Sequence, residues 1–277
     1  MNEVDPLDLP VPRIVQTARY ALVIAGLVAW TSLLAPFQFL FLRRPVLRLW
    51  PKGARELPHL YHRGVARLIG CRITTGGQMT CERPLLLIAN HISWADIVVL
   101  SAVAPVSFVA KAEMITWPLF GWLARAQRTV FVDRDDRKRA AEQADRLSRR
   151  LEAGDAMVLF PEGTTSDGTR VLPFNASLLG AAGNVVRRGN VDAVWIQPVA
   201  LRYSRAQGMA IGRRGMRSVG WPGTVPLLPH LPDTLREGAL DVEVSFGEPV
   251  RFDTATNRKS VSAIAHQAIR DMRARPV

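Results

Sequence analysis

Cysteine is scarce in this chain of 277 residues, which contains only Cys71 and Cys81. Two cysteines make neither a disulfide framework nor a four-ligand zinc site. We therefore expect two reduced thiols in a cytoplasmic domain, with a single bridge across this short segment as the alternative. The sequence also lacks internal repeats and low-complexity tracts, and its length indicates one large domain or two small ones.

Acidic residues are also few relative to basic ones. The chain has 24 Asp and Glu against 36 Lys and Arg, and its formal net charge is +12 at pH 7. This basic excess indicates a polyanionic neighbour, which can be a nucleic acid, an anionic membrane face or a phosphate-bearing substrate. No nucleic-acid-binding motif is present, so we expect no nucleic-acid partner.

Charge is absent between Arg19 and Arg43, where residues 20–41 form a long apolar run. A helix of this length spans roughly 33 Å, against about 30 Å for the apolar core of a bilayer. The run is apolar on every face, which favours a membrane segment over a buried core helix. Acidic residues at positions 3, 5 and 8 disfavour a cleaved signal peptide. Pro36 leaves two arrangements open: a single span, or a bent helical hairpin within one leaflet.

A basic cluster follows the apolar run. Apart from Glu56, all charged residues from position 43 to 67 are basic: Arg43, Arg44, Arg48, Lys52, Arg55, Arg63 and Arg67. By the positive-inside rule this flank faces the cytoplasm. The same residues attract the headgroups of anionic membrane lipids.

Beyond about residue 70, short apolar and β-branched runs alternate with helix-like stretches. The runs begin near residues 84, 105, 128, 156, 193 and 240. This rhythm predicts an α/β domain with a mostly parallel central sheet flanked by helices. We expect helices over residues 135–153 and 259–274, and a loop over the stretch rich in Gly and Pro at residues 208–232.

The first apolar run, LLLIAN, predicts a buried strand that leads directly into His91, with Asp96 five positions later. Ligands of open α/β sheets gather beyond the carboxyl ends of the strands. The two side chains can meet only with His91 in the strand-to-helix turn, because positions five apart on one helix diverge by roughly 140°. Asp96 would then bind one ring nitrogen and leave the other free as a base. The alternative is a structural histidine, with Asp96 placed near a helix start for capping.

Two further strand ends carry polar groups. The segment VLFPEGTTSDG (158–168) places Glu162, Gly163 and Thr164 after a strand, and backbone N–H groups in such a glycine-containing loop suit phosphate or hydroxyl oxygens. The segment TVFVDR ends in Arg134, whose guanidinium can bind a phosphate with two parallel hydrogen bonds. Together the three strand ends would bring a phosphate-bearing molecule to a general base.

Four blocks in this order resemble the membrane glycerolipid acyltransferases, and most closely the 1-acylglycerol-3-phosphate acyltransferases. The blocks are NHISWAD (90–96), TVFVDR (129–134), FPEGTTS (160–166) and IQPVAL (196–201). Lys111, Glu113, Pro118, Gly121 and FGEP (246–249) also fit, and the resemblance covers roughly residues 60–255. It implies a glycerol-3-phosphate acyltransferase-like α/β domain, preceded by a membrane helix or bent helical hairpin.

The resemblance also implies the reaction. A fatty acyl group would pass directly from an acyl-CoA or acyl-carrier-protein thioester to the free hydroxyl of a lysolipid. The first candidate for this acceptor is 1-acylglycerol-3-phosphate, which would give phosphatidic acid. His91 would be the base and Asp96 its orienting partner. Arg134, Glu162, Gly163 and Thr164 match acceptor-binding positions, and Asn90, Lys111 and Pro198 match supporting ones. We expect no metal and no cofactor.

The resemblance sets the expected domain limits and location. They are an N-terminal tail at 1–18, a membrane-anchoring helical segment at 19–55 and an acyltransferase catalytic domain at 56–277. The enzyme would lie on the cytoplasmic side of an inner membrane. Two departures weaken the case for a phosphate on the acceptor, although Arg134 remains: the family often has Arg in place of Thr165, and a basic, glycine-containing run in place of residues 173–179. Both resemble bacterial relatives that act on lyso-ornithine lipid and other lysolipids.

Other functions remain open at this point. A thioester or lipid hydrolase would use His91 to activate water, and a lipid-binding protein would use the His/Asp pair only structurally. No G-x-S-x-G motif is present, and Ser166 in GTTSDG stands one place off, which favours direct transfer. His59 and His62 have the spacing of a metal pair but lack a third ligand nearby. Trp117, Phe120 and Trp122 fit either core or membrane interface.

Overall fold

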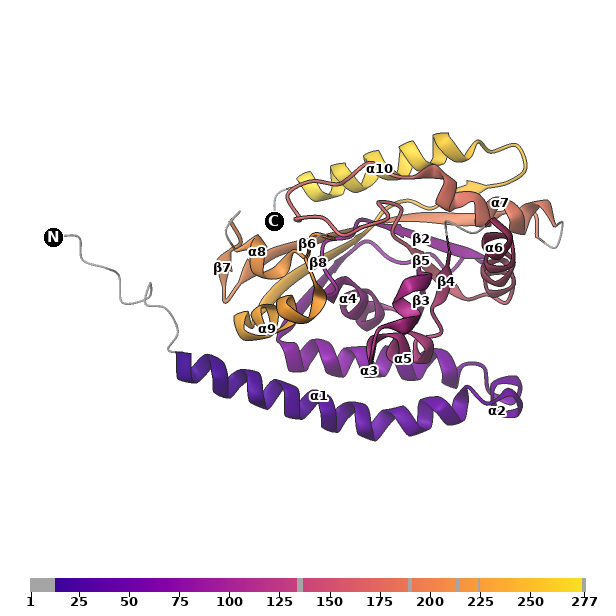
Figure 1. Cartoon of the computed structure of the whole chain (residues 1–277). Coiled ribbons are helices and arrows are strands. Elements are labelled where there is room, and N and C mark those ends of the chain that lie inside the picture. Colours follow the sequence, from indigo (N-terminus) through magenta and orange to yellow (C-terminus); the bar gives the residue numbers. More distant parts are fainter. Residues whose placement is uncertain (1–12, 134–136, 189–190, 213–214, 224, 276–277) are drawn as a thin grey trace.

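A mostly parallel β-sheet runs through the computed structural model, which describes residues 13–133, 137–188, 191–212, 215–223 and 225–275 (Figure 1). Its strands are β1 Cys71–Gly76, β2 Leu85–Ala89, β3 Val106–Lys111, β4 Val130–Val132, β5 Ala156–Leu159, β6 Val194–Ala206, β7 Met209–Ala210, β8 Leu240–Phe246 and β9 Val250–Phe252. The order is β1-β8-β6-β2-β5-β3-β4, with β7 and β9 also paired to β6. Strands β6, β2, β5, β3 and β4 are parallel, whereas β8 runs antiparallel to β6. The predicted α/β class is confirmed.

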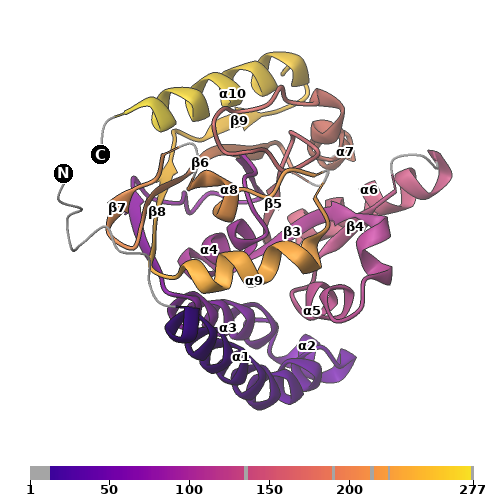
Figure 2. The same ribbon diagram turned by 60° about the vertical axis from the view of Figure 1, so that its left-hand side comes forward.

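Helices cover both faces of this sheet (Figure 1; Figure 2). Helices α7 and α10 lie over one face, and α4 lies against the other, with α3 and then α1 beyond it. The helices are α1 Arg13–Phe41, α2 Arg44–Leu49, α3 Gly53–Ile69, α4 Ala95–Val103, α5 Phe120–Ala126, α6 Arg137–Glu152, α7 Gly180–Arg187, α8 Met216–Val219, α9 Leu227–Glu237 and α10 Arg258–Ala274. Two short 3₁₀ helices are η2 Ala112–Thr116 and η3 Ala176–Leu179.

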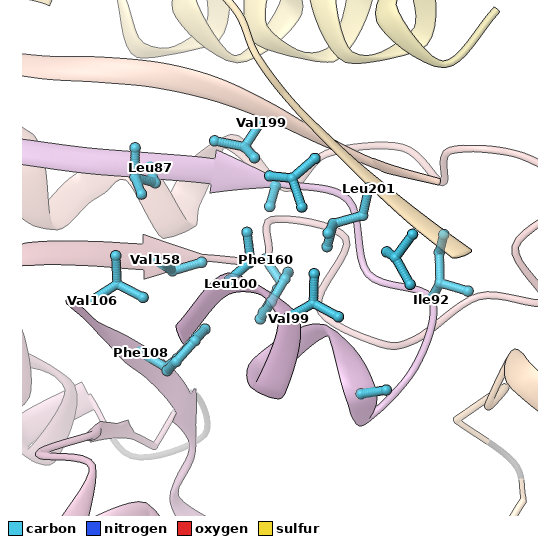
Figure 3. Close-up of a cluster of buried hydrophobic side chains, with 14 of the residues drawn as sticks. Leu87, Ile92, Val99, Leu100, Val106, Phe108, Val158, Phe160, Val199 and Leu201 are labelled. Carbon is cyan, nitrogen blue, oxygen red and sulfur yellow. The ribbon is translucent and has the colours of Figure 1, made fainter. Parts of the chain in front are cut away.

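Strand β2 lies at the centre of the sheet and is buried on both faces. Leu85, Leu87 and Ala89 belong to a hydrophobic core with side chains of α4. Figure 3 shows that side chains of β3, β5 and β6 also belong to this core. Leu86 and Ile88 belong to a second core with α6, α7 and α10. A continuous apolar run is what a parallel strand covered on both faces requires. The end of β2 is therefore held firmly from both sides.

Most of the predicted elements are present. The helices expected over 135–153 and 259–274 correspond to α6 and α10, and strands occur in all six apolar runs. The loop expected over 208–232 was wrong in part, because α8 and the first half of α9 lie within it. Leu227 and Leu235 of α9 are buried, so tertiary packing outweighs the proline content of this segment. Strand β1 was not anticipated.

Helix α1 continues through Pro36 as one helix, so the chain does not break there. One side packs on α3, where the Trp30 indole N–H donates to the Tyr61 carbonyl (2.9 Å). Gly64 permits this approach, since a Cβ there would lie 2.3 Å from Trp30 Nε1. The other side is exposed, with Leu22 72% and Val28 60% accessible.

The helix formed by residues 15–41 is long and apolar enough to cross a membrane. The domain limits at residues 18 and 55 stay predictions.

Candidate active site

His91 and Asp96 meet at the carboxyl end of β2. His91 lies in the turn after the strand, and Asp96 lies in the first turn of α4. The distance from His91 Nδ1 to Asp96 Oδ2 is 2.8 Å. The predicted contact is therefore present, and it exists because the histidine precedes the helix instead of belonging to it.

The Asp96 carboxylate is completely buried and surrounded by donors. Oδ2 also accepts hydrogen bonds from the backbone N–H groups of Ile92 (2.6 Å) and Ser93 (2.9 Å). Oδ1 accepts one from the Tyr203 hydroxyl (2.7 Å). Such donors offset the cost of burying a charge. An acceptor-only carboxylate requires a proton on the facing ring nitrogen, so in the neutral imidazole His91 carries its proton on Nδ1.

The second ring nitrogen of His91 is available. The ring stacks on Phe160, with centroids 3.9 Å apart and an interplanar angle of 11°. Its side chain is 17% exposed, and Nε2 makes no hydrogen bond to any residue in the described part of the chain. The ring is thus fixed along one edge by Asp96 and on one face by Phe160, and in the neutral tautomer Nε2 is the ring nitrogen without a proton.

The loop after β5 holds the backbone of His91. Glu162 Oε1 accepts from the His91 N–H (2.8 Å), and Ser166 donates to the His91 carbonyl from its N–H (2.9 Å) and its hydroxyl (3.0 Å). Glu162 Oε2 accepts from the Leu172 N–H (3.0 Å), so both carboxylate oxygens bind backbone groups. The Ser166 hydroxyl also accepts a hydrogen bond from the Gly168 N–H (3.2 Å).

Burial raises the pKa of Glu162 from 4.5 to about 7, although the His91 and Leu172 N–H groups oppose this shift. Arg273, on α10, lies near the same carboxylate and donates to the Gly168 carbonyl (2.5 Å). Burial lowers the pKa of Arg273, and the charges of Glu162 and Asp96 partly oppose that change. The loop at 161–172 is therefore tied both to His91 and to the C-terminal helix.

The other predicted acceptor-binding residues have mixed outcomes. Gly163 has φ +75°, a conformation that favours glycine, and it turns the chain directly after Glu162. Thr164 is exposed and lies against Gly223, where a Cβ would be 2.1 Å from its Oγ1. Arg134 lies outside the described residues. The roles assigned to all of them stay predictions.

The three supporting residues have different surroundings. Asn90 extends the β2–β6 pairing with its side chain, which accepts from the Leu201 N–H (2.8 Å) and donates to the Leu201 carbonyl (3.1 Å). Pro198 lies within β6, where its carbonyl accepts from the Gly247 N–H (2.8 Å). Lys111 is exposed at the end of β3 and lies 3.7 Å from Glu113. Of the three, Asn90 is directly next to the histidine.

His59 and His62, the two histidines with the spacing of a metal pair, both contact backbone carbonyls. His59 Nδ1 lies 2.6 Å from the Ser101 carbonyl, and His62 Nδ1 lies 2.8 Å from the Pro58 carbonyl. Burial lowers the pKa of His62 to about 4. Among the residues with described positions, no three His, Cys, Asp or Glu side chains form a group that could hold a metal.

Of the three aromatic residues near α5, Trp122 contacts the apolar helix. Trp122 is 36% exposed, and its ring centroid lies 4.9 Å from that of Phe39 on α1. The Trp117 ring centroid lies 6.3 Å from that of Trp221, whose backbone N–H donates to the Ile92 carbonyl in the turn after β2 (2.8 Å). Trp117 and Phe120 are both partly buried. This cluster therefore belongs to a boundary between core and surface.

Two contributing residues were missed from the sequence, Tyr203 and Arg273. Tyr203 stands two positions after the block IQPVAL, and a tyrosine at the end of a buried strand needs a partner for its hydroxyl. That partner could not be named, because the order of the strands was unknown. Arg273 lies in the last turn of α10, where a basic residue is ordinary and gives no signal.

Known proteins are similar to this chain in sequence. A family model described as Acyltransferase matches residues 71–202. A lyso-ornithine lipid O-acyltransferase of Brucella abortus is 52% identical over 92% of this chain and 93% of its own length. A lyso-ornithine lipid O-acyltransferase of Rhizobium meliloti is 48% identical over 82% of this chain and 78% of its own length. A 1-acyl-sn-glycerol-3-phosphate acyltransferase of Neisseria gonorrhoeae is 36% identical over 53% of this chain and 55% of its own length.

The fold also matches a solved structure. The crystal structure of the 1-acyl-sn-glycerophosphate acyltransferase PlsC from Thermotoga maritima has a TM-score of 0.62 and 20% identity, and the match covers 95% of this chain and 97% of that one. Fold and sequence together define an acyltransferase. The chain belongs to the glycerolipid acyltransferase family that its four motifs resemble.

We expect Glu162 to make stability depend on pH. Its proton is bound more tightly in the folded protein, so this contribution is complete below about pH 4.5 and is lost as the pH rises towards 7. The free energy of unfolding should fall by at most about 1.4 kcal/mol per pH unit in this range. Urea unfolding of Glu162→Gln should lack the slope, whereas Glu113→Gln, which alters an exposed carboxylate, should retain it. Parallel curves for wild type and Glu162→Gln would contradict the assignment.

Proposed function

We propose that this enzyme transfers a fatty acyl group from a thioester donor, acyl-CoA or acyl-carrier protein, to the free hydroxyl of a lysolipid, with His91 as general base. The observation that supports it is the free Nε2 on a ring fixed by Asp96 and Phe160. A positioned base of this kind contributes about 10²–10⁴ in rate.

In the proposed reaction His91 Nε2 accepts the hydroxyl proton as the hydroxyl oxygen attacks the thioester carbonyl. The carbon–sulfur bond then breaks, and the imidazolium returns the proton to the departing thiolate. Asp96 stabilises the imidazolium through Nδ1 while that charge exists. The transfer is direct, which agrees with a Ser166 hydroxyl that is engaged with the His91 carbonyl.

We propose lyso-ornithine lipid as the preferred acceptor. The relatives that match most of this chain carry that activity in their names. The family often has Arg where this chain has Thr165. Because threonine is uncharged, this position offers no cation to a phosphate, and its side chain is buried at 7% exposure. Ornithine is an amino acid, and its headgroup lacks the phosphate of lysophosphatidate. 1-Acylglycerol-3-phosphate is the second candidate, because relatives of that name match half of the chain.

We also propose that the exposed side of α1 is embedded in a membrane, with the catalytic domain on the cytoplasmic side of the inner membrane. In the most apolar window of α1 only 6% of the residues are buried, and apolar side chains such as Leu22 and Val28 are exposed among the residues that the structure describes. The basic residues that follow α1 fit anionic lipid headgroups.

We expect His91→Ala to lower acyl transfer by at least about 10²-fold, because it removes the group proposed to accept the hydroxyl proton. Asp96→Asn should lower it similarly by removing the charge behind the ring. Turnover is measured by mass spectrometry of the acylated lipid, with far-UV circular dichroism to verify folding. His266→Ala, which alters a histidine on α10, is the matched control and should retain activity. Full transfer by folded His91→Ala would refute the mechanism.

We expect lyso-ornithine lipid to be acylated with a kcat/KM at least about tenfold above that of lysophosphatidate, a difference within reach of headgroup contacts. Purified enzyme is incubated with labelled acyl-CoA or acyl-carrier protein and each lysolipid, and the products are identified by mass. Faster acylation of lysophosphatidate would support the second candidate. Release of free fatty acid in place of acylated lipid would indicate a hydrolase.

We expect the double variant Leu22→Glu/Val28→Glu to bind vesicles containing anionic lipid at least about tenfold more weakly, since two carboxylates would enter the apolar region. Binding is measured by co-sedimentation. Met209→Glu, at an equally exposed apolar residue on β7, should bind as the wild type does. Equal sedimentation of the double variant and this control would place the membrane contact elsewhere.

A further inference from the structure

Tyr203 is a fully buried tyrosine whose hydroxyl binds the Asp96 carboxylate. It lies on β6, opposite Val242 of β8, and is 5% exposed within the core that also contains Phe160. Phenylalanine would fill the same apolar space, so packing alone does not account for the hydroxyl. Its Oη–H donates to Asp96 Oδ1 at 2.7 Å, on the carboxylate oxygen that His91 does not contact.

We propose that Tyr203 is a positioning residue for the reaction: it acts through Asp96 to set the orientation and charge of the carboxylate that holds His91. This inference rests on the proposed role of His91 as general base. The two oxygens of Asp96 have separate partners, since Oδ2 receives His91 and the turn N–H groups, and Oδ1 receives Tyr203. The hydroxyl therefore prevents the carboxylate from rotating away from the ring.

The local backbone delivers Tyr203 to this point. The Asn90 side chain binds both backbone groups of Leu201, two residues before Tyr203, and so fixes β6 relative to the end of β2. The hydroxyl also stays protonated, because burial and the neighbouring Asp96 charge raise the pKa of Tyr203 well above 10. The tyrosine thus donates to the carboxylate throughout the working pH range.

Few other ionisable groups act on this chain of hydrogen bonds. Glu162 faces it from the loop after β5, and Arg273 faces it from α10 with charge interactions to both Glu162 and Asp96. Cys71, from β1, lies near the tyrosine, and burial raises the pKa of its thiol to about 12, so it remains neutral. These groups are unchanged by a substitution at Tyr203.

The test is Tyr203→Phe, which removes one oxygen atom. Without this donor the carboxylate keeps more of its negative charge towards His91 and favours the imidazolium form. We expect kcat to fall by about threefold to thirtyfold with KM within about twofold, and the acid limb of the kcat profile to move up by several tenths of a pH unit. Tyr61→Phe, which removes a hydroxyl bound to Thr31 (3.0 Å) away from the site, should leave that limb in place.

A second measurement covers the case in which Tyr203→Phe fails to fold. The chain has three tyrosines, so 3-fluorotyrosine incorporated into Tyr20→Phe/Tyr61→Phe labels position 203 alone. Fluorination makes the phenol a stronger donor, and the acid limb should then move to lower pH. Stationary limbs in both proteins would overturn the inference. Asp96→Asn separates the two hypotheses: full turnover there would sink the proposed mechanism itself, whereas its loss together with stationary limbs would sink only the role of Tyr203.

Discussion

The Asp96 carboxylate joins three parts of the structure at one buried point. It receives the N–H groups of Ile92 and Ser93 from the active-site turn, the ring of His91, and the hydroxyl of Tyr203 from β6. Removing an ionised group from water costs several kcal/mol, and only a complete set of donors offsets this cost. The geometry of the turn therefore depends on the carboxylate, and the position of the ring depends on both.

The opposite side of His91 is held in a different way. Its backbone N–H and carbonyl bind Glu162 and Ser166, which lie on the loop after β5. Because β5 is the parallel neighbour of β2, the segments that follow the two strands leave the sheet at the same edge and in the same direction. The histidine thus has its side chain fixed by α4 and its main chain fixed by an adjacent loop, and Nε2 is the part of the ring left free.

The sequence predicted those parts of the site that depend on neighbouring residues. His91 and Asp96 are five positions apart, so the strand-to-helix turn alone brings them together. The bond from His91 to Glu162 joins residues 71 positions apart, and that from Tyr203 to Asp96 joins residues 107 apart. Such contacts follow from strand order, which periodicity does not encode. For the same reason Glu162 was expected to contact the acceptor, and its use in binding the His91 backbone was not foreseen.

Packing across α3 connects the apolar helix to the pair formed by His91 and Asp96. Helix α1 rests on α3 through Trp30 and Tyr61, and α3 meets α4 where His59 binds the Ser101 carbonyl (2.6 Å). Helix α4 carries Asp96 in its first turn. Under the proposed membrane role of α1, the bilayer surface and His91 Nε2 are therefore held at a fixed relative height by three packed helices. A lipid acceptor held in that bilayer by its acyl chain would approach the base in a restricted orientation, and orientation of this kind lowers the entropic part of the barrier.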